Sequence, residues 1–212
     1  MPVVGLIHST RLVIQTVHDV VAKAKPELEI INVLDEGLLK CLRREAFHRV
    51  VPRMTALAKG LEEDGAELII VTCSSLSPYV DGVREHINAP IIKIDEPMIQ
   101  WAIENHDSIG IVMTNPTTQS PTASLVEEVS RRLNKEVKVE YRLCGEAFER
   151  LNRGDVDGHD AVVVATVETL MQEVEVVLLA QISIARVIQQ IDPKIKERVF
   201  SSLDFITQKL VQ

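Results

Sequence analysis

Cys73 is the residue of this chain whose setting best suits chemistry. It ends an apolar segment and is followed by the residues SSLSP, which predict the start of a helix. A cysteine at a helix N-terminus is more reactive because the helix dipole stabilises its thiolate form. This setting suits a nucleophile or a base, although a cysteine so placed also serves as a small core side chain. Cys41 and Cys144 lack such a setting, and we expect them to be packing residues.

The histidines offer one further candidate. The six histidines show no metal-binding spacing, so we predict no metal site and expect most of the rings on the solvated surface. His8 is the exception, because the first strand of a doubly wound unit usually lies beside the third, within reach of Cys73. The sequence leaves open whether His8 orients a substrate, activates the thiol or only ends a strand. No G-x-G-x-x-G or Walker motif is present, and we predict no cofactor.

The elements that position these residues follow from hydrophobic periodicity. Short apolar runs alternate with segments of helical period, which is typical of βαβ units with a parallel sheet. Pro52 suits the first turn of one of the helices. The predicted strands span residues 3–8, 29–34, 67–72, 90–94, 108–113, 137–143, 175–179 and 198–200.

The second half of the chain repeats the pattern of the first half. The segment VVGLIHST matches DSIGIVMTN, ELIIVTCSS matches VEVVLLAQIS, and PIIKIDEPMIQ matches ERVFSSLDFITQ. These matches pair Gly5 with Gly110 and Cys73 with Gln181 at nearly the same offset. We therefore predict an α/β fold of two pseudo-symmetric, doubly wound parallel-sheet units that arose by internal duplication. The first unit covers 1–97, the second covers 98–201, and 202–212 form a C-terminal helix; the alternative is that parallel strands simply look alike.

Topology places the candidate binding residues, because parallel α/β sheets bind ligands at the carboxyl ends of their strands. Hydroxyl and amide side chains collect there in both halves, and the helix N-termini they open leave backbone N–H groups for a carboxylate or phosphate. Each of them, taken singly, is also an ordinary helix cap. The candidates are His8, Ser9, Thr10, Arg11, Ser74 and Ser75 in the first half, and Thr114, Asn115, Thr117, Thr118, Gln181 and Ser183 in the second.

Composition excludes several classes of protein. With 46% hydrophobic and only 3% aromatic residues among 212, the chain has a core of aliphatic side chains, which disfavours disorder and an aromatic-rich β-sandwich. The formal charge of −8 and the lack of a basic run argue against nucleic acid and anionic membranes as partners. No apolar run approaches the length of a membrane span, and the start of the chain has no basic leader. Three scattered cysteines indicate reduced thiols, and we expect a cytoplasmic protein.

Three short segments, VTCSS, VLLAQIS and VMTNPTT, are similar to those of a known protein family. The chain resembles the aspartate/glutamate/hydantoin racemase superfamily, in which two α/β domains each contribute a cysteine as acid or base on opposite faces of a carbon acid. The first of these cysteines matches Cys73, whereas the second falls on Gln181, whose amide cannot exchange a proton near neutral pH. The resemblance implies a homodimer and a small carboxylate or amino-acid substrate with an acidic α-carbon.

Three reactions stay open for one thiol. They are protonation on one face after decarboxylation, addition of sulfur to an unsaturated acid with isomerisation, and racemisation with a different second base. Gln181 is expected to position substrate or to hydrogen-bond a developing oxyanion. The alternative is a non-catalytic protein that binds a small carboxylate on the same fold.

Overall fold

The computed structural model describes residues 1–210, apart from the side chains of Gln208 and Lys209. All eight predicted strands are present, and each strand end lies within one residue of its predicted position. The described chain forms two compact units, Met1–Ile94 with the C-terminal residues from Ile206, and Asp95–Phe205.

The first unit holds a four-stranded parallel sheet. Its strands are β1 (Val3–His8), β2 (Glu29–Leu34), β3 (Ala66–Val71) and β4 (Ile91–Lys93), in the order β2-β1-β3-β4. Its α-helices are α1 (Ile14–Ala24), α2 (Gly37–Arg43), α3 (Val50–Glu63) and α4 (Val80–Arg84). Short 3-10 helices are η1 (Arg11–Val13), η2 (Phe47–Arg49), η3 (Ser74–Tyr79) and η6 (Thr207–Leu210).

The second unit repeats this arrangement. Its strands β5 (Ser108–Met113), β6 (Lys138–Leu143), β7 (Val176–Leu179) and β8 (Val199–Ser201) are all parallel, in the order β6-β5-β7-β8. Its helices are α5 (Glu96–Asn105), α6 (Gln119–Leu133), α7 (Gly145–Asn152), α8 (Val156–Leu170), α9 (Pro193–Lys196) and α10 (Leu203–Ile206), with η4 (Pro116–Thr118) and η5 (Ile182–Gln190). Because strand order, strand direction and the helices on the sheet agree in both units, the predicted α/β fold of two similar units is confirmed.

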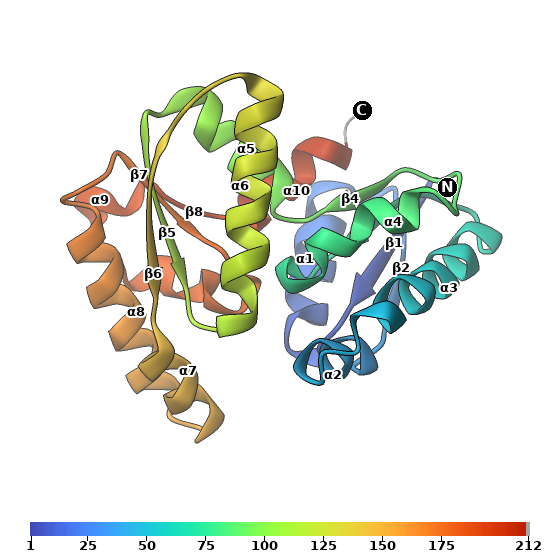
Figure 1. The fold of residues 1–212 in the computed structure, drawn as a ribbon, viewed down its shortest axis with the longest axis horizontal. Coiled ribbons are helices and arrows are strands. Elements are labelled where there is room, and N and C mark those ends of the chain that lie inside the picture. The colour runs from blue at the N-terminus through green and yellow to red at the C-terminus, as the bar shows by residue number, and fades with distance from the viewer. Residues whose placement is uncertain (211–212) are drawn as a thin grey trace. The chain divides into compact units, whose positions relative to one another are not determined.

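The sheet of the second unit is covered on both faces, as its sequence pattern requires. Side chains alternate along a strand, so Ile109 and Ile111 of β5 pack on one face with α5 and α6. Val112 faces the other way and packs with α7, α8 and η5. Figure 1 shows α6 and α8 on opposite sides of this sheet. Strands buried on both faces must be apolar throughout, which explains why they appear in the sequence as continuous hydrophobic runs.

Gly5 and Gly110 occupy equivalent places in the two sheets. Each lies in the central part of the first strand, and each lies under a leucine of the helix that packs on that strand. A Cβ atom on Gly5 would stand 2.7 Å from Leu61 Cδ1, and one on Gly110 would stand 2.6 Å from Leu170 Cδ2. The two units therefore need a glycine here for the same reason, which is the close approach of helix and strand.

Two sequence expectations need correction. Only His48 and His86 of the six histidines are exposed, so the expectation that most are solvated is wrong; His159 is as fully buried as His8. The helix that begins after Cys73 is also not an α-helix at first, but the six-residue 3-10 helix η3, which runs into α4. Pro78 lies inside this turn and has no backbone N–H to donate.

Candidate active site

The predicted site residues of the first unit follow two neighbouring strands. His8 ends β1, Ser9 and Thr10 follow it, and Cys73 is the N-cap residue of η3, two residues after β3. Because β1 pairs with β3, the two loops meet at the same edge of the sheet. Cys73 is half-buried with extended backbone, and Ser74 and Ser75 beside it are buried. The pairing of the two strands thus places the loop with Ser9 and Thr10 beside the loop with Cys73, Ser74 and Ser75.

His8 is held by two polar neighbours. Its Nδ1 lies 2.8 Å from Thr72 Oγ1, and its Nε2 lies 3.0 Å from Asn32 Oδ1. The ring is fully buried, and this burial lowers the pKa of His8, with the hydrogen bond to Asn32 opposing the shift. His8 is therefore neutral near pH 7, and its contact is with the residue that precedes Cys73.

Gln181 is the counterpart of Cys73 in the second unit. Both residues follow the third strand of their sheet, begin a 3-10 helix and have extended backbone. The side-chain oxygen of Gln181 accepts hydrogen bonds from Thr114 N at 2.6 Å, Asn115 N at 3.0 Å and Thr114 Oγ1 at 3.2 Å. Three donors on one oxygen fix the direction of the amide, so its NH₂ end points away from them. Two backbone N–H groups expected to bind a ligand anion are thus occupied by Gln181.

Several other candidates act as caps or surface ion pairs. Thr10 Oγ1 accepts from Leu12 N, and Asn115 Oδ1 accepts from the backbone N and the hydroxyl of Thr117. Arg11 has an exposed side chain and pairs with Glu36 at 3.0 Å. Ser183 lies on η5, where its carbonyl oxygen accepts from Arg186 Nη1. Ser9 and Thr118 are buried, and Ser9 Oγ has no hydrogen-bond partner within residues 1–210.

A buried charged cluster near Gln181 was missed by the sequence reasoning. Asp160 on α8 accepts from Arg186 Nη2 at 2.6 Å and from Gln190 Nε2 at 3.1 Å, both on η5. His159 Nδ1 lies 2.6 Å from the same carboxylate, whereas its buried Nε2 has no partner in the described part of the chain. Burial raises the pKa of Asp160, but the hydrogen bonds from Arg186 and His159 outweigh burial, so its pKa is lowered. The cluster holds η5, which begins beside Gln181, against α8.

Lys93 at the end of β4 was also missed, although a signal was present. Its side chain is almost fully buried, and Nζ lies 3.1 Å from Asp81 Oδ2 on α4. A lysine inside the apolar run PIIKID is a pattern that predicts a paired buried charge. By contrast, Cys41 and Cys144 are buried as expected, and burial raises the pKa of the Cys144 thiol despite its contact with Thr166.

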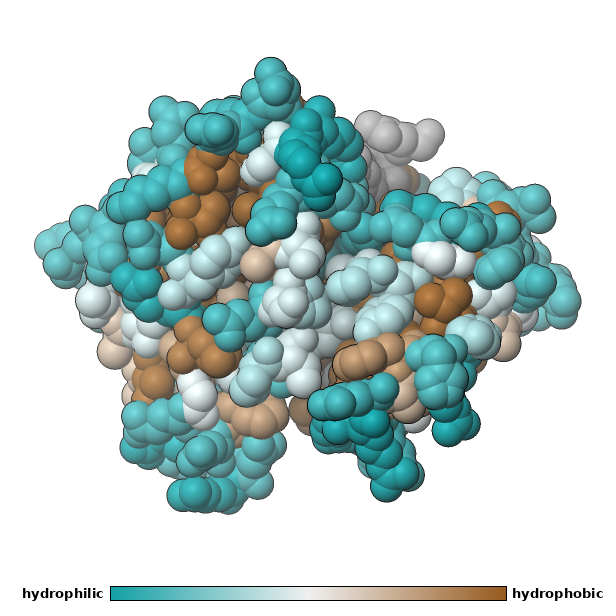
Figure 2. Space-filling model, viewed as in Figure 1, coloured by the Kyte–Doolittle hydropathy of each residue, from teal (hydrophilic) through white to brown (hydrophobic). Residues whose placement is uncertain are grey.

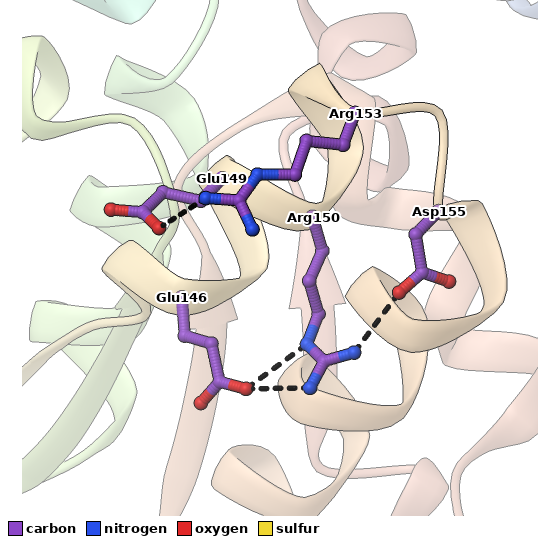
Figure 3. A pocket seen from close by; sticks show the side chains of 5 residues that line it. All are labelled: Glu146, Glu149, Arg150, Arg153 and Asp155. Carbon is purple, nitrogen blue, oxygen red and sulfur yellow. Dashed lines mark hydrogen bonds and ion pairs between the residues drawn. The ribbon is translucent and has the colours of Figure 1, made fainter.

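Two surface hollows lie apart from these residues. One of about 210 Å³ in the second unit is lined by the ion-paired side chains shown in Figure 3, among them Arg150 between Glu146 and Asp155. Another of about 410 Å³ in the first unit is lined by Val51, Pro52, Thr55, Ala56, Lys59 and His86. Neither contains a site residue predicted from the sequence.

The surface in view is mostly hydrophilic, with small apolar patches separated by hydrophilic side chains (Figure 2).

Within residues 1–210, no group of three or more His, Cys, Asp or Glu side chains is arranged to hold a metal ion. No helix in the described part of the chain is long and apolar enough to cross a membrane.

The family model described as Asp/Glu/Hydantoin racemase matches residues 7–210. The chain belongs to this family. The matched residues include the loop with Cys73 in the first unit and the loop with Gln181 in the second. The resemblance inferred from VTCSS, VLLAQIS and VMTNPTT is thus confirmed at the level of the family. No curated protein sequence matches the chain.

Solved structures show the same fold at low sequence identity. An aspartate racemase homologue from Pyrococcus horikoshii OT3 has a TM-score of 0.71 at 18% identity, covering 100% of this chain and 98% of that one. Allantoin racemase from Klebsiella pneumoniae has a TM-score of 0.72 at 14% identity, covering 100% and 86%. Unliganded arylmalonate decarboxylase has a TM-score of 0.64 at 14% identity, covering 100% and 92%. These members of one fold include racemases and a decarboxylase.

Proposed function

We propose that this member of the racemase family is a cofactor-independent isomerase, racemase or lyase. It acts at the carbon next to the carboxylate of a small acid or amino acid, with Cys73 as the reacting thiol. The observation that carries the proposal is the place of Cys73, half-buried after β3, with the buried Ser74 and Ser75 next to it in sequence and the buried Ser9 on the loop after the neighbouring strand β1. A thiolate here removes a proton from the α-carbon, or the thiol returns one to it.

The substrate carboxylate is bound by the hydroxyl groups around the thiol. Ser9 supports this assignment, because its buried Oγ has no hydrogen-bond partner within residues 1–210 and a buried hydroxyl without a partner is costly. Ser74 and Ser75 are buried next to Cys73 and supply further hydroxyl groups. We expect Arg11 of the first unit, and Thr117, Thr118 and Ser183 of the second unit, to bind the same kind of anion.

Gln181 takes the place of the second cysteine in this proposal. With Oε1 held by three donors, the amide offers only its NH₂ hydrogens to a substrate. It therefore suits a role as hydrogen-bond donor to a developing oxyanion and does not exchange a proton. This assignment favours a reaction with proton transfer on one face, such as protonation after loss of CO₂.

The thiol is tested by substitution and by trapping. Small carboxylic acids are first screened for a rise in melting temperature, and turnover is then followed by α-proton exchange in deuterated water and by release of CO₂. Cys73→Ala abolishes turnover and Cys73→Ser retains little, whereas Cys144→Ala, which removes a buried thiol, leaves turnover intact. Iodoacetamide alkylates Cys73 first, and a small dicarboxylate slows the alkylation. Full turnover by Cys73→Ala would overturn the proposal.

A non-catalytic carboxylate-binding protein is the second candidate function. It is favoured by Gln181, because the second of the family's two acid–base positions holds an amide. An inert Cys73 thiol, together with carboxylate binding that survives Cys73→Ala and no exchange of the α-proton, would support it.

A homodimer and a cytoplasmic location stay predictions. Light scattering of the purified chain tests the first, and fractionation of its cells of origin tests the second.

A further inference from the structure

A chain of polar side chains leads from the surface of the first unit to the residue before Cys73. Asn32 Nδ2 lies 2.9 Å from His18 Nδ1, Asn32 Oδ1 lies 3.0 Å from His8 Nε2, and His8 Nδ1 lies 2.8 Å from Thr72 Oγ1. His18 is half-buried on α1, Asn32 is exposed on the edge strand β2, and His8 is fully buried. The ring of His8 therefore depends on Asn32 as its partner at Nε2.

The directions of these hydrogen bonds follow from the protons available. His8 is neutral, since burial lowers its pKa, and a neutral imidazole carries one N–H. The Asn32 oxygen faces Nε2 and can only accept, so the proton of His8 is on Nε2. Nδ1 is then an acceptor, and it receives the hydroxyl proton of Thr72.

The tautomer of His8 decides where the Thr72 hydroxyl points. Thr72 Oγ1 has one proton and two acceptors within reach, His8 Nδ1 at 2.8 Å and Ile7 O at 3.1 Å. If His8 carried its proton on Nδ1 instead, it would donate to Thr72, and the hydroxyl would turn to Ile7 O. Thr72 is also tied to β1 through its backbone N–H, which donates to Ile7 O at 3.0 Å. The direction of this hydroxyl is therefore set immediately next to Cys73.

We propose that Asn32 is a positioning residue of the Cys73 site. It fixes His8 as the Nε2–H tautomer, and through His8 it sets the Thr72 hydroxyl and the backbone from which Cys73 extends. The proposal rests on the function proposed above for Cys73, but its first step, the His8 tautomer, is independent of that function.

Asparagine suits this place because one side chain must donate to His18 and accept from His8. A leucine offers neither group and leaves the buried Nε2–H without an acceptor. An aspartate offers only acceptors, so it keeps the proton of His8 on Nε2 while His18 must present an N–H to it. Asn32 is exposed on an edge strand, so these substitutions remove no core packing.

Nitrogen-15 NMR of the histidine side chains tests the first step. At pH 7.5 we expect His8 of the wild-type chain to carry its proton on Nε2, with an unprotonated Nδ1. Asn32→Leu gives a mixture of the two tautomers, whereas Asn32→Asp restores the Nε2–H form. Asn105→Leu, which removes an exposed asparagine of α5 that donates to Trp101 O, is the matched control and leaves His8 unchanged.

The rate of Cys73 alkylation by iodoacetamide tests the second step. We expect Asn32→Leu to change this rate by about three- to tenfold, the effect of one hydrogen bond. Asn32→Asp should bring the rate most of the way back to that of the wild type. An Nδ1–H tautomer in the wild type, or an unchanged His8 tautomer in Asn32→Leu, would overturn the proposal. A shifted tautomer with an unchanged alkylation rate would likewise overturn the positioning of Cys73. If only the proposed catalysis is wrong, no turnover is found, but Asn32→Leu still changes the tautomer of His8.

Discussion

At the scale of single residues, two side chains of the site are defined by the direction of their hydrogen bonds. Gln181 accepts from three donors of the loop after β5, and His8 lies between Asn32 and Thr72. In both cases the polar group is fixed by the protein before any ligand arrives, which is how a preorganised site limits reorganisation during a reaction.

The oxygen and the NH₂ group of Gln181 have separable effects. Gln181→Leu leaves Thr114 N and Asn115 N without their acceptor, and we expect it to lower the free energy of unfolding by about 1–3 kcal/mol. Gln181→Glu keeps an acceptor oxygen and costs less stability, but it removes the NH₂ donor, so turnover falls. Urea unfolding and turnover of both variants check this. Equal stability of the two variants would contradict the assigned direction of the amide.

Gln181→Cys should combine a gain in chemistry with a loss of stability. A thiol at this position supplies a second proton-transfer group, but it does not replace the oxygen that the loop after β5 uses. We therefore expect gain of α-proton exchange on both enantiomers only together with a loss of stability like that of Gln181→Leu. A melting temperature equal to that of the wild type would contradict this.

His8 makes stability depend on pH. Its pKa is lowered in the folded chain, so protonation of His8 favours the unfolded chain. Its contribution is complete above the ordinary imidazole pKa of about 6.5 and is lost as the pH falls below that value and through the lower pKa of the folded state. Comparing urea unfolding of the wild type and His8→Gln from pH 8 to pH 5 should show a smaller slope in the variant. His48→Gln, at an exposed site, is the matched control.

At the scale of elements, the contact between α8 and η5 depends on charge as well as apolar packing. The Asp160 carboxylate is nearly buried and binds Arg186 through two hydrogen bonds, whereas the Arg186 side chain is 41% exposed. Since η5 begins immediately after Gln181, this ion pair holds the segment that follows Gln181 against α8.

Removing Arg186 leaves a buried carboxylate behind. We expect Arg186→Met to cost about 2 kcal/mol of unfolding free energy, below the usual range for a buried pair because solvent already screens the guanidinium. Arg153→Met, which breaks the exposed pair with Glu149, is the matched control and should cost less than about 0.5 kcal/mol. Urea unfolding measures both, and equal effects would show that the buried carboxylate finds other partners.

At the scale of the whole molecule, the two units have a glycine at the same position of the first strand, where a helix packs closely on the sheet. Gly5 and Gly110 each allow a helix to approach the first strand of a sheet, under Leu61 and Leu170. Identical strand orders in the two units agree with an internal duplication.

Alanine at these glycines should therefore destabilise both units. We expect about 1–3 kcal/mol for each substitution from overpacking. Gly110→Ala has the larger effect, because its new methyl group would also meet Leu170 Cγ at 2.8 Å, whereas Gly5→Ala meets Leu61 Cγ at 3.1 Å. Thermal unfolding checks the order. Gly60→Ala, at an open position of α3 with no neighbour within 4 Å of the new methyl group, is the control and should not destabilise.

The sequence by itself determined the eight strands, their alternation with helices and the likeness of the two halves. These features follow from local patterns, because an apolar run of strand length or a helical period is formed by residues close together in the sequence. The place of Cys73 at the carboxyl end of a strand followed in the same way. The prediction that the first strand lies beside the third required only the usual order of strands in such units.

Only the tertiary structure decided how the polar side chains are paired. Gln181 bonds to residues 66 and 67 positions away, and Asn32 joins histidines 14 and 24 positions away. The burial of His159 and its contact with Asp160 and Arg186 depend on the rotation of α8 against η5. Such pairings depend on the strand register and on the rotation of each helix, and both are set by the packing of the core. The residues next to a side chain in the sequence do not specify them.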